Sequence, residues 1–174
     1  MRAVKLDYAH PHKFMHIDIF TDGSSRGNPG PGGWAYLLRV TDKDCKEIPG
    51  DGGEAYTTNN RMELMAVIEG LAFARANFPE AKEIRIVSDS SWVINTMTKN
   101  WKRKKNLDLW AMLTPLLKDL KIDWKWVKGH AGHRENEDCD SRATRQADRQ
   151  ARLPQKSQKT ALKEPVKFLK QSLF

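Results

Sequence analysis

Four acidic residues stand where strands or helices are expected to begin or end: Asp22, Glu63, Asp89 and Asp140. Asp22 and Asp89 each close a short apolar run, whereas Glu63 opens a run with helical spacing. Carboxylates held close together repel one another unless a cation lies between them. Because no His or Cys ligand pattern accompanies them, the oxygen ligands favour Mg²⁺ or Mn²⁺ over zinc. The residue types therefore raise the hypothesis of a metal site built from four carboxylates.

Each acid taken singly has an ordinary explanation as a helix cap or a surface charge. The segment Thr58–Leu64, with sequence TNNRMEL, by itself describes a capped helix. Capping does not explain Asp22 and Asp89 at the ends of strands. Ligands of open α/β sheets gather at strand ends, and neighbouring strands lie roughly 4.8 Å apart. Two such carboxylates can therefore share one ion, and Glu63 can reach the same spot from its helix.

The first elements that must position these acids are strands. His16–Asp22 alternates with period two and ends in glycine, which predicts a strand. A second strand is predicted over Trp34–Val40, and a third between Lys46 and Thr57. Asp51–Gly53 is expected to interrupt the third strand as a turn or bulge. Short turns join the three, so an antiparallel meander is expected.

Helices and strands alternate in the rest of the chain. The apolar spacing predicts, in chain order, a helix over Leu64–Leu71, a strand over Glu83–Ser88, a helix through Trp92–Met97, a helix over Leu109–Leu120 and a strand over Ile122–Val127. Pro115 is expected to kink the fourth of these elements or to loosen one of its hydrogen bonds. Ala143, Ala147 and Ala151 space a small-residue stripe along a last helix starting near Glu135. This order predicts an α/β fold with a five-stranded mixed sheet flanked by helices.

Composition fits one domain in a reducing compartment. With 174 residues the chain can bury a sizeable core, and we expect an N-terminal extension over 1–15, a catalytic domain over 16–152 and a basic, flexible tail over 153–174. No apolar run approaches the roughly 20 residues of a membrane helix, and Met1–His16 has no apolar signal core. The two cysteines form no metal or disulfide motif. A cytoplasmic protein without membrane attachment is predicted.

The positive charge is concentrated in two places. The net charge is +8, and the segment from Arg152 onward carries six basic residues against Glu164 alone. A second cluster, Lys99–Lys105, surrounds Trp101. Such clusters suit a polyanion, because neutralised phosphates release counterions. A solubilising, solvated surface is the alternative interpretation.

Five ordered motifs resemble type I ribonuclease H. They are Thr21–Ser24, Gly27–Gly33, Thr58–Leu64, Asp89-Ser90 and Lys128–His133, and together they cover roughly 16–151. The resemblance implies endonucleolytic cleavage of the RNA strand of an RNA–DNA hybrid, leaving 5′-phosphate and 3′-hydroxyl ends. It also implies two Mg²⁺ ions, with Mn²⁺ as a substitute, held by Asp22, Glu63, Asp89 and Asp140.

The same resemblance suggests roles for other residues. His130, on a glycine-flanked loop, would carry protons near neutral pH, and His133 would structure that loop. Thr58 resembles the family's phosphate-pocket position on the DNA strand. The predicted contacts with the hybrid, several of them to 2′-hydroxyls in the minor groove, are Gly23, Asn28, Thr58, Asn59, Asn60, Ser90, Ser91 and Trp101.

The chain departs from the family pattern in three places: two lie within the matched region, and the third is the basic tail and the leading segment Met1–Met15, which fall outside the match. Many bacterial members insert a long basic helix and loop where this chain runs from Asn100 to Trp110 almost directly, so the basic handle is shortened and Lys102–Lys105 would compensate in part. Ser141-Arg142 follows Asp140 where an apolar pair is usual.

Three classes of function are compatible with these features. They are a hybrid-specific ribonuclease, a non-catalytic hybrid- or double-strand-binding module, and another metal-dependent nuclease or strand-transferase on the same sheet. A binding module is expected to lack at least one acid, and all four are present. Asn59-Asn60 and Gly27–Gly33 favour the first class.

The end of the chain carries a separate motif. Lys170–Phe174 is similar to peptides that bacterial replication proteins insert into the sliding clamp, although Lys170 stands where glutamine is usual. The alternative is a frayed terminus whose apolar residues pack on the domain. We expect a monomer.

Overall fold

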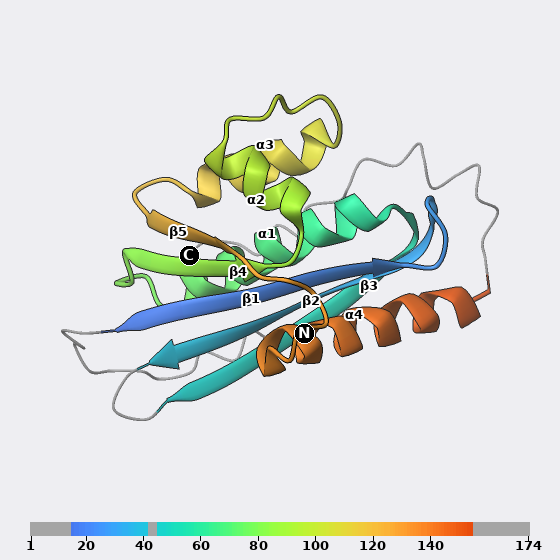
Figure 1. Ribbon diagram of the computed structural model, residues 1–174, viewed down its shortest axis with the longest axis horizontal. Helices are drawn as coiled ribbons and strands as arrows, with labels where there is room; N and C mark the ends of the chain where they lie inside the picture. The colour runs from blue at the N-terminus through green and yellow to red at the C-terminus, as the bar shows by residue number, and fades with distance from the viewer. Residues whose placement is uncertain (1–14, 42–44, 155–174) are drawn as a thin grey trace, which may run out of the picture.

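The computed structural model describes residues 15–41 and 45–154 (Figure 1). In chain order the elements are β1 (His16–Ser25), β2 (Gly30–Thr41), β3 (Lys46–Thr57), α1 (Asn59–Asn77), β4 (Glu83–Ser88), α2 (Ser91–Thr98), α3 (Leu107–Leu116), β5 (Lys121–Trp126) and α4 (Arg134–Arg152). The five strands form one sheet in the order β3-β2-β1-β4-β5. β1, β2 and β3 pair antiparallel, whereas β4 runs parallel to β1 and β5 parallel to β4. The predicted five-stranded mixed sheet is confirmed.

The alternation of side chains along the strands gives the sheet two apolar faces. One face, which includes Ile19 and Ile86, packs against α1, α2 and α3. The other, which includes Phe20 and Val87, lies under α4 (Figure 1). Helices therefore cover both faces, and the acids can approach the sheet edge from either side.

α4 lies unusually close to the sheet. A Cβ atom on Gly33 of β2 would lie 2.2 Å from the carbonyl oxygen of Ala143, so only glycine fits there. Ala143 and Ala147 are fully buried at this contact. Ala151, the third residue of the predicted small-residue stripe, is exposed, because the last turn of α4 extends past the sheet.

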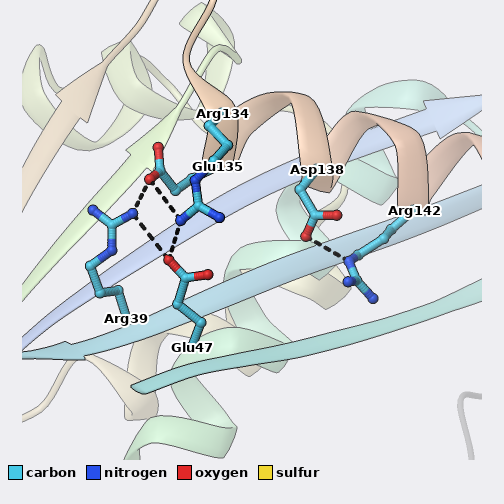
Figure 2. Close-up of polar contacts among 6 residues, drawn as sticks. All are labelled: Arg39, Glu47, Arg134, Glu135, Asp138 and Arg142. Atoms are coloured by element: carbon cyan, nitrogen blue, oxygen red, sulfur yellow. Dashed lines mark hydrogen bonds and ion pairs between the residues drawn. The ribbon is translucent and has the colours of Figure 1, made fainter. Parts of the chain in front are cut away.

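Charged side chains connect the first turn of α4 to β2 and β3 (Figure 2). Arg39 of β2 pairs with Glu135, and Arg134 pairs with Glu47 of β3. Arg39 and Glu47 also contact each other at 3.2 Å, which closes the network. The hydrogen bond from Arg134 contributes most to lowering the pKa of Glu47. One turn further on, Asp138 and Arg142 form an ion pair within the helix at 2.8 Å.

Three predicted features of the elements are wrong, two in the strands and one in α3. β1 does not end at Asp22 but continues to Ser25, because its antiparallel pairing with β2 extends through the glycines of that strand. β3 is not interrupted at Asp51–Gly53; the register shift lies instead between Gly30 and Gly32. A Cβ atom on Gly52 would lie 2.5 Å from the ring of Trp34, so this glycine makes room for an aromatic side chain within the strand.

α3 is shorter than predicted. It ends at Leu116, one residue after Pro115, instead of continuing with a kink to Leu120. Pro115 lacks the backbone N–H that a continuing helix needs and falls in the last turn.

The expected N-terminal extension, up to residue 14, and the tail from residue 155 lie outside the described residues, and so does Lys170–Phe174. Within 15–41 and 45–154, no helix has both the length and the apolar character needed to cross a membrane.

Candidate active site

Three of the four predicted acids meet where the parallel pairing of the central strands β1 and β4 ends. Oxygen atoms of Asp22, Glu63 and Asp89 all lie within 4.8 Å of one another. The parallel register of β1 and β4 ends at the pair Thr21 and Ser88. Asp22 is the next residue of β1 and Asp89 directly follows β4, so their carboxylates lie side by side where the parallel pairing stops.

Glu63 joins the two aspartates because α1 begins directly against β1. Thr58 caps the helix by accepting a hydrogen bond from the Arg61 backbone N–H at 3.4 Å. A Cβ atom on Gly23 would lie 2.2 Å from the backbone nitrogen of Glu63, so the strand and the helix touch backbone to backbone. The Gly23 backbone N–H also donates to Asp22 Oδ1 at 2.7 Å.

Burial and mutual repulsion disfavour the charged forms of Asp22 and Glu63. Burial first, and the charge of Asp89 second, raise the pKa of Asp22 to about 8. Burial and the charge of Asp22 raise the pKa of Glu63 well above its usual range. Glu63 Oε1 accepts a hydrogen bond from Asn59 Nδ2 at 3.3 Å, whereas Oε2 is buried without a partner among the described residues. A cation would satisfy this oxygen and relieve the repulsion, so the residues fit a hard divalent metal ion.

Asp140 lies beside this cluster, but it is not one of the three acids whose oxygen atoms lie within 4.8 Å of one another. It projects from α4, and its charge contributes to the raised pKa of Asp22. Its Oδ2 lies 3.9 Å from Nδ1 of His130. The His130 side chain is 80% exposed and its backbone has a positive φ of 53°. The predicted proton carrier thus stands at the rim of the cluster, next to the fourth acid.

Several predicted substrate contacts surround a cavity of about 420 Å³ next to α1. Asn28, Thr58 and Asn60 line one part of it, and the basic segment Lys102–Lys105 lines another. Asn28 Oδ1 also accepts a hydrogen bond from the backbone N–H of Asn59 at 3.3 Å. The cavity therefore combines uncharged hydrogen-bonding groups with four basic side chains.

The other predicted contacts are dispersed. Gly23 is buried against Glu63, and the structure gives it a packing role. Ser90 caps α2 by accepting from the Val93 backbone N–H at 3.5 Å, and Ser91 is exposed. Trp101 is 49% exposed and is not among the residues that line the cavity. His133 directly precedes α4. Its backbone carbonyl accepts a hydrogen bond from the backbone N–H of Glu137 at 3.0 Å.

Sequence reasoning missed the groups that support the cavity. Trp92 and Trp110 pack with ring centres 5.5 Å apart, and the Arg103 guanidinium lies 4.6 Å from the Trp110 ring centre. Arg61 forms a bidentate ion pair with Asp108 at 2.9 and 2.7 Å, which ties α1 to α3. Arg61 and Asp108 stand 47 residues apart, so no local pattern could have revealed this pair.

The short connection between α2 and α3 matches the expected loss of the basic handle. No helix lies between Lys99 and Asn106, and both Asn100 and Asn106 have positive φ values, 52° and 57°. Asparagine tolerates this left-handed conformation better than most residues.

A five-stranded sheet in this order, with a cluster of carboxylates where its parallel pairing ends, has the ribonuclease H-like fold. A model of the RNase H family matches residues 15–148, and the chain belongs to the ribonuclease H family.

Relatives and solved structures agree with this assignment. The chain is 45% identical over 139 residues to a Ribonuclease H of Campylobacter concisus, covering 75% of this chain and 92% of the relative. The N-terminal RNase H domain of Rv2228c from Mycobacterium tuberculosis is 28% identical, with a TM-score of 0.68 over 79% of this chain and 97% of that chain. LC11-RNase H1 in complex with RNA/DNA hybrid is 21% identical, with a TM-score of 0.62 over 76% of this chain and 97% of that chain, which shows a shared fold.

Proposed function

We propose that this protein is a ribonuclease H that hydrolyses the RNA strand of RNA–DNA hybrids and leaves 5′-phosphate and 3′-hydroxyl ends. The observation that carries the proposal is the meeting of Asp22, Glu63 and Asp89 within 4.8 Å, in a chain that belongs to the ribonuclease H family. The catalytic unit is assigned to residues 16–152, and the protein is proposed to act as a cytoplasmic monomer.

The metal ligands are assigned to Asp22, Glu63, Asp89 and Asp140, and the metal to Mg²⁺, with Mn²⁺ as a substitute. Two bound ions would activate the attacking water and stabilise the leaving 3′ oxygen. The protein supplies buried carboxylates whose repulsion and orphaned oxygen favour a bound cation. Asp140, which lies at the rim, would complete the ligand set from α4.

His130 is assigned to proton transfer near the cluster. Its imidazole is exposed and lies 3.9 Å from Asp140, so it can exchange protons with solvent and with the reaction. Histidine is the side chain that most often serves in general acid–base catalysis, and it can transfer a proton in either direction.

The cavity beside α1 is assigned to the hybrid. Asn28, from the β1–β2 connection, and Asn60 line the cavity, and Asn59 lies beside them at the start of α1. Their amides can hydrogen-bond 2′-hydroxyls and base edges of the minor groove. Thr58 faces the same cavity, and Lys102–Lys105 supply charge for the phosphates of the DNA strand. Gly23, Ser90, Ser91 and Trp101 are retained as further proposed contacts.

A test compares labelled RNA–DNA hybrid, double-stranded RNA and double-stranded DNA, each with Mg²⁺ and with chelator. Cleavage of the hybrid alone, lost in chelator and in Asp22→Asn, is the expected result. Binding without cleavage would instead support the hybrid-binding module. Equal cleavage of double-stranded DNA would indicate another metal-dependent nuclease.

The terminal segment Lys170–Phe174 is proposed as a sliding-clamp ligand, with leucine and phenylalanine as apolar anchors. Calorimetry of clamp binding before and after deletion of residues 170–174 tests this. No binding by the full chain, or unchanged binding after deletion, would refute the assignment.

A further inference from the structure

Asp89 differs from Asp22 and Glu63 in how it is held. Asp22 and Glu63 are buried, whereas Asp89 is half-buried and follows the end of β4. The register of β4 and β5 ends at the pair Ser88 and Trp126, so no strand pairing constrains Asp89 itself. Its position must come from other contacts, and three of these come from one segment, Trp126–Asn136.

Trp126 holds the backbone of Asp89. Its indole Nε1–H donates to the carbonyl oxygen of Asp89 at 3.0 Å. The Trp126 side chain is nevertheless 51% exposed at the end of the edge strand β5. Exposing this much aromatic surface gains little for the core, so the hydrogen bond to Asp89 is the clearest contribution of this tryptophan to the structure.

Asn136 holds the carboxylate of Asp89. This residue is 2% exposed on the inner side of α4, and its Nδ2 donates to Asp89 Oδ2 at 3.4 Å. Hydrogen bonds at catalytic sites are often long before substrate binds. If the amide were flipped, Asn136 Oδ1 would face Asp89 Oδ2, and both atoms are acceptors. The carboxylate therefore determines that Nδ2 is the amide atom that faces it.

Among the described residues, the other amide atom of Asn136 adds no hydrogen bond to the fold. Its Oδ1 is buried without a hydrogen-bond partner among the described residues. A buried, unsatisfied acceptor destabilises a protein, and an apolar side chain of similar shape would avoid the penalty. A residue retained at such a cost suggests a role outside folding.

Gly129 makes the third contact between this segment and Asp89. A Cβ atom at this position would lie 2.6 Å from Asp89 Oδ2, so the backbone of the β5–α4 connection packs directly against the carboxylate. His130 is the next residue in that connection. The segment that carries the proposed proton carrier is therefore also the segment that limits how Asp89 can turn.

We propose that Asn136 and Trp126 are positioning residues that orient Asp89 as a metal ligand, Asn136 through the carboxylate and Trp126 through the backbone. This proposal rests on the proposed metal-dependent function. Groups that hydrogen-bond to metal ligands commonly change metal affinity or activity by about 10- to 100-fold when they are removed. Through Gly129, the same segment links the orientation of Asp89 to the place of His130.

The decisive variant is Asn136→Leu, which removes the donor to Asp89 and the orphaned Oδ1 together. Its melting temperature in chelator should stay within about 3 °C of the wild type, because the lost bond is offset by the lost penalty. Its affinity for Mg²⁺, measured by calorimetric titration of the metal-free protein, should fall about tenfold. kcat should fall with it, whereas KM for the hybrid should not change, because Asn136 is buried away from the substrate.

Trp126→Phe tests the second contact, because it keeps a ring and removes the N–H. Since the side chain is half exposed, folding should be unaffected, and the Mg²⁺ affinity should fall about threefold, less than for Asn136→Leu. Asn77→Ala is the matched control. Asn77 Nδ2 donates to the Phe73 carbonyl near the far end of α1, so its loss should leave the Mg²⁺ affinity unchanged.

Wild-type Mg²⁺ affinity in both Asn136→Leu and Trp126→Phe would overturn the proposal, even if their activity fell. A loss of affinity only in proportion to a loss of folded protein would overturn it as well. Failure of the proposed function is a separate outcome, because it would appear in the wild type as absent Mg²⁺ binding or absent hybrid cleavage.

Discussion

The backbone of Gly23 in β1 lies directly against the backbone of Glu63 in α1. A Cβ atom on Gly23 would approach the Glu63 nitrogen to 2.2 Å and the Met62 carbonyl carbon to 2.4 Å. Asp22 and Glu63 stand 41 positions apart in the sequence, yet this contact brings their carboxylates together. The distance between two acids of the cluster is thus set by a glycine that carries no functional group.

Gly23→Ala should damage the acid cluster and the fold together. The added methyl must push α1 away from β1, since the atoms it meets are backbone. Overpacking of this kind costs about 1–3 kcal/mol of unfolding free energy. Urea denaturation should show that loss, and calorimetry should show at least tenfold weaker Mg²⁺ binding.

Gly70→Ala is the control for this prediction. Its added methyl would lie 2.8 Å from Ile19 Cγ2, a side-chain atom away from the acids. It should change stability without changing the Mg²⁺ affinity. Mg²⁺ binding that is equally strong in Gly23→Ala would contradict the role of the Gly23–Glu63 contact.

The metal-free protein should lose stability as the pH rises from about 4 to about 8. The pKa of Asp22 is raised from 3.8 to about 8 in the folded state, so the folded protein binds more protons than the unfolded chain in this window. The contribution of such a group is fully present below the unfolded pKa and is lost as the pH rises through the folded value. The raised pKa of Glu63 acts in the same direction. Urea denaturation in chelator across this range measures the effect.

Asp22→Asn separates this effect from other titrations. The variant keeps an oxygen that can accept from the Gly23 backbone N–H but removes the charge. In chelator at pH 8 it should be more stable than the wild type, with a flatter dependence on pH, although it should not cleave the hybrid. A wild-type stability that stays level or rises between pH 5 and 8 would speak against the raised pKa of Asp22.

His130→Ala should slow hydrolysis without abolishing it. The imidazole stands at the rim of the cluster and is 80% exposed, so solvent water can replace part of its proton transfer. General acid–base groups contribute about 10²–10⁴-fold, and single-turnover cleavage of the hybrid should fall within that range. The Mg²⁺ affinity should not change. Complete loss of cleavage would mark His130 as indispensable.

The basic segment should govern how strongly salt weakens hybrid binding. Lys104 and Lys105 line the cavity with Asn28, Thr58 and Asn60. Replacing both lysines with alanine should weaken hybrid binding and lower the slope of log affinity against log salt by about 1–2. Fluorescence anisotropy over a salt series, with chelator to prevent cleavage, gives that slope.

Lys82 and Lys118 provide the matched pair for this experiment. Neither lines the cavity, and Lys82 contacts the carbonyl of Pro79, at the opposite end of β4 from Asp89. Replacing both with alanine removes the same charge, so an equal change in slope would show that the effect is one of overall charge.

Local patterns in the sequence predicted the sheet well. Strand alternation located β4 at Glu83–Ser88 as observed, and the acid after it led to the expectation that Asp89 and Asp22 lie side by side. That inference used two rules, that ligands gather at strand ends and that neighbouring strands lie roughly 4.8 Å apart. It succeeded although β1 continues past Asp22, because the parallel pairing, not the strand, ends there.

Contacts between distant segments could not be predicted in the same way. Nothing around Asn136 distinguishes it from a surface asparagine, and its burial follows only from how α4 docks. Asp51–Gly53 suggests a turn to any local rule, yet Gly52 is needed beneath the ring of Trp34. Both features depend on residues far away in the chain, where propensity carries no information.

The contact between Gly33 and Ala143 has a consequence for how this protein can diverge. Because two backbones meet there, the height of α4 above β2 is determined by steric exclusion and not by the identity of the side chains on the solvent side of the helix. That outer surface can accumulate substitutions over evolutionary time while Asp140 keeps its place beside the other acids. The charge on the outer surface of α4 can therefore change without moving Asp140 relative to the other acids.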